Sequence, residues 1–289
     1  MNPEYYPIIS GAVGGAAAAG AFKGPIETLT QIWYLTLGRF TDDAFQKYKV
    51  QQAINIERFR KNLEENIDNI SEENIKEPEI SVVGPALEAS KFYMGENEIR
   101  SMFAKLIASS MDKTQSDNIH PSFVEMIKML SPLDAQNLYY LYHNNDGTIS
   151  TLRTTVSDTG AYTDHHKHFF LGNPECQDIS LIEPSIDNLV RLKLVDVNYD
   201  AWKSDDSLYN KYRESPVFLK FESEIEAQRI TLKASLEYLT NGGELTGVSS
   251  DKKLAAIEDM KQASKATAGI HKGIIKLTAF GRNFCKVCL

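Results

Sequence analysis

The sequence predicts a mainly helical protein, with an N-terminal helical domain that contains a long amphipathic helix and a winged-helix-like α+β C-terminal domain. Three observations lead to this fold class. Apolar residues recur at steps of three and four through residues 41–142. Strand-like, β-branched stretches appear only after Tyr142. Near the C-terminus, a short helix precedes two such stretches, which is the order of a winged-helix module. The predicted domains are residues 1–40, 41–142 and 143–289, with an insert at about 203–270.

Residues 41–70 are expected to form one helix of about eight turns. Thr41-Asp42-Asp43 resembles a helix cap with acidic residues in the first turn. The apolar side is formed mainly by Phe45, Tyr48, Ile56, Phe59, Leu63, Ile67 and Ile70. A bundle within the chain and a coiled-coil seam between chains would both use such a helix. The spacing lies nearer 3.6 than 3.5 residues, which favours the bundle.

Three more helices are expected between Glu96 and Tyr142. The first carries a broad apolar stripe, and Pro121 suits the first turn of the second. Ser131-Pro132-Leu133-Asp134 then resembles a capping box at the start of the third. Together the three helices predict a compact folding nucleus, and nothing in them indicates catalysis.

The C-terminal part is expected to contain strands at Thr148–Val156, Leu194–Val197 and Gly273–Thr278. A short helix beginning at Glu183-Pro184-Ser185 precedes the second strand. The insert is expected to project, with helices at Val217–Leu239 and Asp251–Ala268.

Tyr5–Phe22 carries no charged residue and is rich in Gly and Ala. Its length would suffice for a membrane span, but Gly and Ala contribute little transfer energy. Small residues spaced by four would allow close helix packing. Three interpretations stay open: a soluble packed segment, an oligomerisation face and a membrane-inserting segment. The residues assigned to an oligomer or membrane face are Gly11, Gly15, Gly20, Gly24 and Trp33.

Composition narrows the function classes. Hydrophobic content of 42% and charged content of 24% are typical of soluble globular proteins. The net charge of -8 argues against general nucleic-acid binding, which requires a basic face. Three cysteines are too few for a disulfide framework, so a reducing cytoplasm is the expected compartment.

Motifs for chemistry are sparse. The cluster Asp164-His165-His166-Lys167-His168 is interpreted as a solvated polar loop, because no further ligand lies at a recognisable metal-site spacing. Cys285 and Cys288 have redox-motif spacing but are interpreted as apolar packing residues of a terminal helix. Gly11-x-x-Gly14-Gly15 lacks the Lys-Ser/Thr of a P-loop. No catalytic residue, metal or cofactor is predicted.

Several segments together resemble a known family. They are Glu98–Ala108, His120–Val124, Leu130–Ala135, Asp187–Leu192 and Leu277–Cys285. The chain from about Ile80 to the C-terminus, apart from the insert, resembles the bacterial abortive-infection alpha family, a domain of unknown function assigned to phage defence. These look like fold-defining positions, so no catalytic residue is carried over. The resemblance implies a role in abortive infection, where a defence protein stops growth or kills the infected cell.

Three mechanisms follow as hypotheses. The first is a non-enzymatic protein that self-associates through its N-terminal helices and acts on a membrane or a protein partner. The second is a soluble winged-helix sensor or adaptor that binds a phage protein or, with less support, nucleic acid. The third is an enzyme that uses His165–His168. A cytoplasmic location is expected, with membrane association through residues 5–40 as an option.

Overall fold

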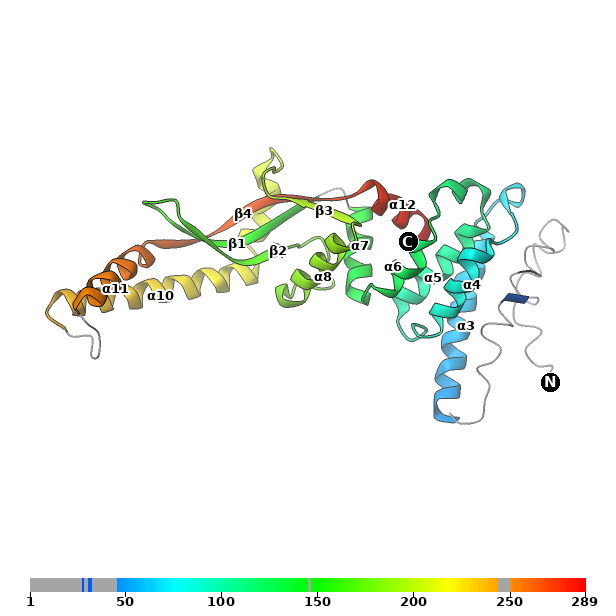
Figure 1. Cartoon of the computed structure of the whole chain (residues 1–289), viewed down its shortest axis with the longest axis horizontal. Coiled ribbons are helices and arrows are strands. Elements are labelled where there is room, and N and C mark those ends of the chain that lie inside the picture. Colours follow the sequence, from blue (N-terminus) through cyan, green and yellow to red (C-terminus); the bar gives the residue numbers. More distant parts are fainter. Residues whose placement is uncertain (1–27, 29–30, 33–45, 145–146, 244–249) are drawn as a thin grey trace. The chain divides into compact units, whose positions relative to one another are not determined.

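The computed structural model describes residues 28, 31–32, 46–144, 147–243 and 250–289 (Figure 1). The chain divides into two compact units. The first unit contains the described residues up to His143, together with Asn188–Val195 and Leu277–Leu289. The second unit contains the described residues of Asn144–Asp187 and Asp196–Lys276. Gly11, Gly15, Gly20, Gly24 and Trp33 lie outside the described residues, so their role stays a prediction.

The first unit is helical. Its elements are α3 (Gln46–Asp68), η4 (Glu72–Asn74), α4 (Ile80–Ser90), α5 (Asn97–Ser110), η5 (Lys113–Asn118), α6 (Ser122–Lys128), α7 (Pro132–His143) and α12 (Ala279–Cys288). The polar stretch at 113–118 is a 3-10 helix, which Asp112 caps by accepting a hydrogen bond from the Thr114 N–H (2.8 Å). Two further elements, α8 (Ile179–Arg191) and β3 (Val195–Asn198), contribute residues to both units, as does the last strand through Leu277.

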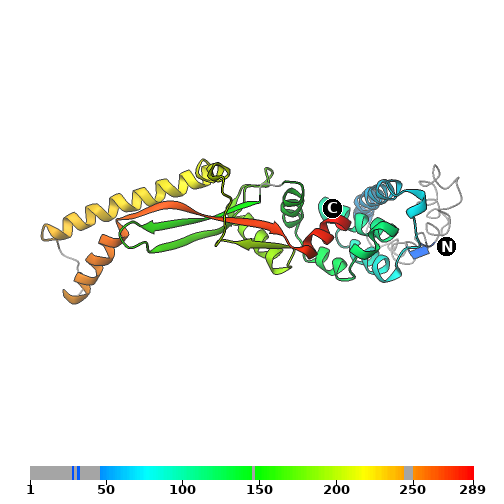
Figure 2. The ribbon, with the colours of Figure 1, turned by 90° about the horizontal axis from the view of Figure 1, so that it is seen from above.

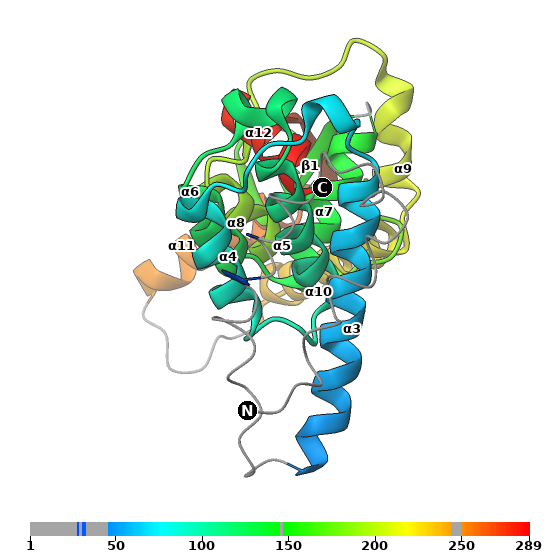
Figure 3. The same cartoon turned by 90° about the vertical axis from the view of Figure 1, so that its right-hand side faces the viewer.

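Helix α5 forms the centre of the first unit. Its predicted apolar stripe is fully buried, and α3, α4, α6, α7 and α12 all pack against it. Helix α3 contributes Phe59, Leu63 and Ile67 to this core, and Figure 3 shows α3 alongside the other helices of the unit. The bundle interpretation of this helix is therefore confirmed. The proposed cap at residues 41–43 lies outside the described residues.

The capping box at the start of α7 is confirmed. The Ser131 N–H donates to the Asp134 carboxylate at 2.8 Å, and the Asp134 N–H donates to the Ser131 hydroxyl at 3.2 Å. The same carboxylate accepts a hydrogen bond from Asn188 Nδ2 at 2.8 Å. Asp134 is buried, so these bonds replace the water that its charge loses.

The second unit is built on a four-stranded sheet, one strand more than the three expected from the sequence. Its strand order is β2-β1-β4-β3, with β1 antiparallel to both neighbours. The elements not yet bounded are β1 (Thr148–Val156), β2 (Tyr162–Phe169), η6 (Asp206–Tyr209), α9 (Asn210–Arg213), α10 (Pro216–Thr240), α11 (Ser250–Ala263) and β4 (Ala266–Leu277). The detailed winged-helix arrangement is not confirmed, whereas the mainly helical class is.

One face of this sheet carries an aromatic core. Its buried members are Leu152, Phe169, Tyr209, Tyr212, Phe218, Phe221 and Ile225. The Tyr212 hydroxyl donates to the Thr148 carbonyl oxygen at 2.7 Å, which satisfies a buried phenol. Helix α10 runs along the sheet, and α10 and α11 continue beyond the end of the strands (Figure 1, Figure 2).

Three element boundaries differ from expectation. Helix α8 begins at Ile179, a turn before the expected start, with Pro184 inside it. Strand β2 was not expected at all. The segment Asp251–Ala268 was expected to be helical throughout. Helix α11 ends at Ala263 instead, and the chain from Ala266 onward pairs with β1. Pairing with a distant strand overrides the helical preference of this Ala-rich segment.

Candidate functional site

The histidine cluster lies in strand β2, so its interpretation as a loop was wrong. β2 pairs with β1, with His166 opposite Leu152. Exposed His165 contacts the face with the aromatic core, where its Nε2 lies 3.0 Å from Thr154 Oγ1. His166 and His168 instead contact α8. The alternation of a strand therefore separates the histidines between two faces.

Two carboxylates of α8 hold these histidines. His166 Nδ1 lies 3.3 Å from Glu183 Oε2, and His168 Nε2 lies 3.1 Å from Asp187 Oδ1. The two acids are four residues apart, so they share one face of the helix. Glu183 also accepts a hydrogen bond from the Lys167 backbone N–H at 2.8 Å, which satisfies a donor on the edge strand. Both acidic side chains of this helix thus contact side chains of the neighbouring strand.

Tyr199 follows β3 and reaches across the sheet to β2. Its hydroxyl accepts a hydrogen bond from the His168 backbone N–H at 3.0 Å and lies 3.2 Å from His168 Nδ1. Its ring stacks near His271, with centroids 5.4 Å apart, and near His168, at 6.0 Å. A Cβ at Gly273 would lie 2.6 Å from Tyr199 Cδ1, so only glycine leaves room for the ring.

Burial sets the protonation of this cluster. Burial lowers the pKa of His168, and the nearby carboxylates of Asp187 and Glu183 oppose that shift. Burial also lowers the pKa of His271, with a further contribution from Arg153. The pKa of Tyr199 is raised, again mainly by burial. The neutral forms are therefore favoured, and Asp187, His168 and Tyr199 form a chain of polar contacts that joins α8 to the sheet.

No sequence pattern indicated Tyr199 or Gly273, because their contacts join segments far apart in the chain. The sequence contained a weak signal for Glu183 and Asp187, which are spaced by four residues in a predicted helix. Across the part of the chain that the structure describes, no group of three or more His, Cys, Asp or Glu side chains could hold a metal ion.

The cysteines are not a reactive pair. Cys285 and Cys288 are buried free thiols in α12, as the packing interpretation expected. Burial raises the pKa of Cys285 to about 12 and raises the pKa of Cys288 well above its usual value. Thiolate is the reactive form, so both residues are inert in the folded chain.

Helix α10 exposes three large apolar side chains on its outer side. Leu219, Ile230 and Tyr238 are 51%, 60% and 63% exposed. At 3.6 residues per turn they fall within an arc of about 100°, opposite the buried side that carries Phe218 and Ile225. We call these three residues the outer face of α10.

Comparison with known proteins adds one match. A family model described as abortive infection alpha matches residues 51–288, which confirms the family resemblance seen in the sequence. No curated protein and no solved structure matches the chain. Among the described residues, no helix combines the length and the apolar content that a membrane crossing requires. Tyr5–Phe22 lies outside that range.

Proposed function

Because this chain belongs to the abortive infection alpha family, we propose that it acts in phage defence through protein contacts made by the outer face of α10. The family points to abortive infection as the biological role. The observation that carries the proposed mechanism is the exposure of Leu219, Ile230 and Tyr238 on a helix whose opposite side packs on the sheet. A helix buried on one side normally carries polar residues on the other.

Burial of this face would supply part of the free energy of a complex. Each exposed side chain would contribute roughly 1–2 kcal/mol on burial, since about half of it is already covered. Together the three supply roughly 3–6 kcal/mol, whereas a micromolar complex needs about 8 kcal/mol after the cost of association, so the partner must also make contacts around this face.

Self-association remains part of the proposal through the N-terminal segment. Tyr5–Phe22 has no charged residue, and its small residues at Gly11, Gly15 and Gly20 suit a close helix contact or a membrane surface. Deletion of residues 1–23 tests this role separately. A smaller particle in sedimentation without detergent would support self-association, and loss of protein from the membrane fraction would support membrane contact. If the shortened chain keeps the same particle size and stays in the soluble fraction, the segment has no role in the mechanism.

The outer face is tested with a charge-matched pair of double variants. Ile230→Glu with Tyr238→Glu places two negative charges on the face. The control, Gln228→Glu with Lys233→Gln, makes the same change in net charge on other exposed positions of α10. Protection is measured as the efficiency of phage plating on cells that express each variant at equal level. Circular dichroism checks that both variants keep their helices.

Loss of protection in the first variant, with protection retained in the control, is the expected result. From 2–4 kcal/mol of lost contact energy, binding would weaken by roughly 30-fold to 1000-fold. Full protection by the first variant would refute the role of this face. A steep salt dependence of partner binding would favour the alternative, a winged-helix sensor or adaptor that binds nucleic acid.

A further inference from the structure

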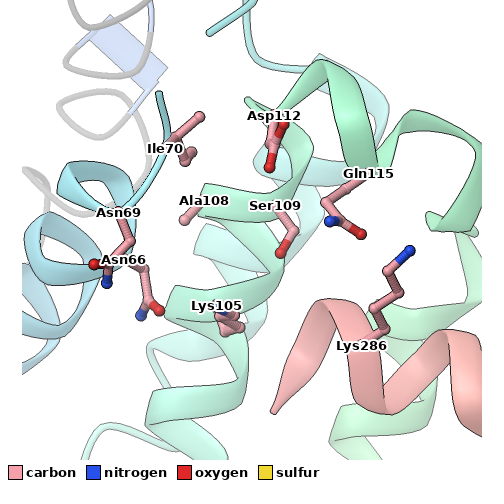
Figure 4. A pocket seen from close by; sticks show the side chains of 9 residues that line it. All are labelled: Asn66, Asn69, Ile70, Lys105, Ala108, Ser109, Asp112, Gln115 and Lys286. Carbon is pink, nitrogen blue, oxygen red and sulfur yellow. The ribbon is translucent and has the colours of Figure 1, made fainter. Parts of the chain in front are cut away.

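A polar pocket lies in the first unit. Figure 4 shows its lining, which α3, α5, η5 and α12 supply together. Asn66, Lys105, Asp112, Gln115 and Lys286 are the lining residues that matter here. The volume is about 80 Å³, several times the 10–15 Å³ or so that one water molecule needs. The pocket is therefore large enough for a small polyatomic ion.

The pocket carries two positively charged side chains. Lys105 and Lys286 enter it from two helices that are far apart in the sequence. Among the described residues, no carboxylate forms an ion pair with either ammonium group. Other lysines of the unit behave differently, since Lys61 and Lys128 pair with Glu65 and Glu125. Because both lysines line the same pocket, an anion bound there would interact favourably with both ammonium groups.

The remaining lining groups suit an oxyanion. Gln115 supplies an amide group that can donate hydrogen bonds. Asp112 is the one acidic lining residue, and its Oδ1 already accepts hydrogen bonds from the Thr114 N–H and hydroxyl, both at 2.8 Å. Part of its negative charge is thus compensated. Asn66 donates its amide to the Asn62 carbonyl oxygen at 2.7 Å, which leaves its own oxygen as an acceptor for a protonated ligand oxygen.

We propose that this pocket binds a phosphate group. Phosphate combines negative charge with several acceptor oxygens and, near neutral pH, a partly protonated oxygen that can donate a hydrogen bond to Asp112 or Asn66. The two lysines bind it as point charges from two sides. Because the pocket is small, the rest of a phosphorylated ligand would project into solvent. The phosphate could belong to a soluble molecule or to a lipid headgroup, and the two sources are separated by experiment.

The test uses the full chain and inorganic phosphate. Side-chain amide signals of Gln115 and Asn66 are followed by NMR during titration, with sodium chloride and acetate at equal ionic strength as references. The pocket variant is Lys105→Gln with Lys286→Gln. The control, Lys61→Gln with Lys128→Gln, removes the same charge from lysines outside the pocket. In a second arm, phosphatidylcholine vesicles with and without phosphatidic acid are sedimented with each protein.

Saturable shifts with phosphate are expected, with little response to chloride or acetate. Affinity should fall about tenfold for each lysine replaced, since charged hydrogen bonds are lost, and the control should bind like the unaltered chain. Phosphate binding without vesicle binding identifies a soluble ligand. Binding only to phosphatidic acid vesicles, lost in the pocket variant, identifies a headgroup. Equal responses to phosphate and acetate, or equal binding by the two variants, or no binding in either arm, would overturn the proposal.

Discussion

The substitution Gly273→Ala should weaken the contact between Tyr199 and β2 and destabilise the second unit. The new Cβ would lie 2.6 Å from Tyr199 Cδ1 and 3.0 Å from the Asn198 carbonyl oxygen. An ordinary contact is about 3.4 Å or more, so the ring must shift by nearly 1 Å. Overpacking of this size costs roughly 1–3 kcal/mol, and losing the Tyr199 hydrogen bond adds about 1 kcal/mol. Against this, alanine restricts the unfolded chain and returns about 0.4–1 kcal/mol. The net loss of unfolding free energy is about 1–3 kcal/mol.

Gly269→Ala is the matched control on the same strand. Its Cβ would meet nothing closer than the Arg153 carbonyl oxygen, at 4.0 Å, so this variant should be as stable as the original or slightly more so. Urea unfolding followed by circular dichroism measures both. Repeating Gly273→Ala in a Tyr199→Ala background completes a double-mutant cycle, in which most of the cost should disappear. The reasoning fails if Gly273→Ala matches its control, or if the cost persists without the Tyr199 ring.

Three further outcomes are expected. Gly281→Ala should destabilise the chain by a few kcal/mol, because its Cβ would overlap a backbone carbonyl oxygen of the first unit, whereas Gly95→Ala, whose Cβ would meet nothing within 4 Å, should stabilise by about 0.4–1 kcal/mol; the difference in urea midpoint between them decides this. Folding lowers the pKa of His168, so the unfolded chain binds more protons than the folded chain near pH 6.5. The free energy of unfolding should therefore decline as the pH falls through 6.5 and below. His168→Gln should flatten that decline, which unfolding measured at several pH values would show. A thiol reagent should leave Cys285 and Cys288 unlabelled in the native chain and label both in urea; native labelling of either would show that α12 opens.

Local rules were sufficient for much of the first unit. The buried stripe of α5 and the capping box of Ser131 and Asp134 depend on residues three or four positions apart, and the sequence displays such spacings directly. The same holds for strand β1, whose β-branched run identified it before its partners were known. Burial of Cys285 and Cys288 followed similarly from the terminal helix. The family resemblance also came from such fold-defining positions.

Tertiary structure alone decided the rest, because those features depend on pairs that are distant in the chain. β2 contains few strong strand formers, and only pairing with β1 and contacts from Glu183 fix the histidines on two faces. The Tyr199 ring fits against the sheet only because residue 273 has no side chain. A local sequence pattern cannot predict this contact, because the two residues are far apart in the chain. Lys105 and Lys286 meet at one pocket although 180 positions separate them in the sequence. Periodicity fixes which side of an element is buried, whereas long-range packing chooses which side chains meet.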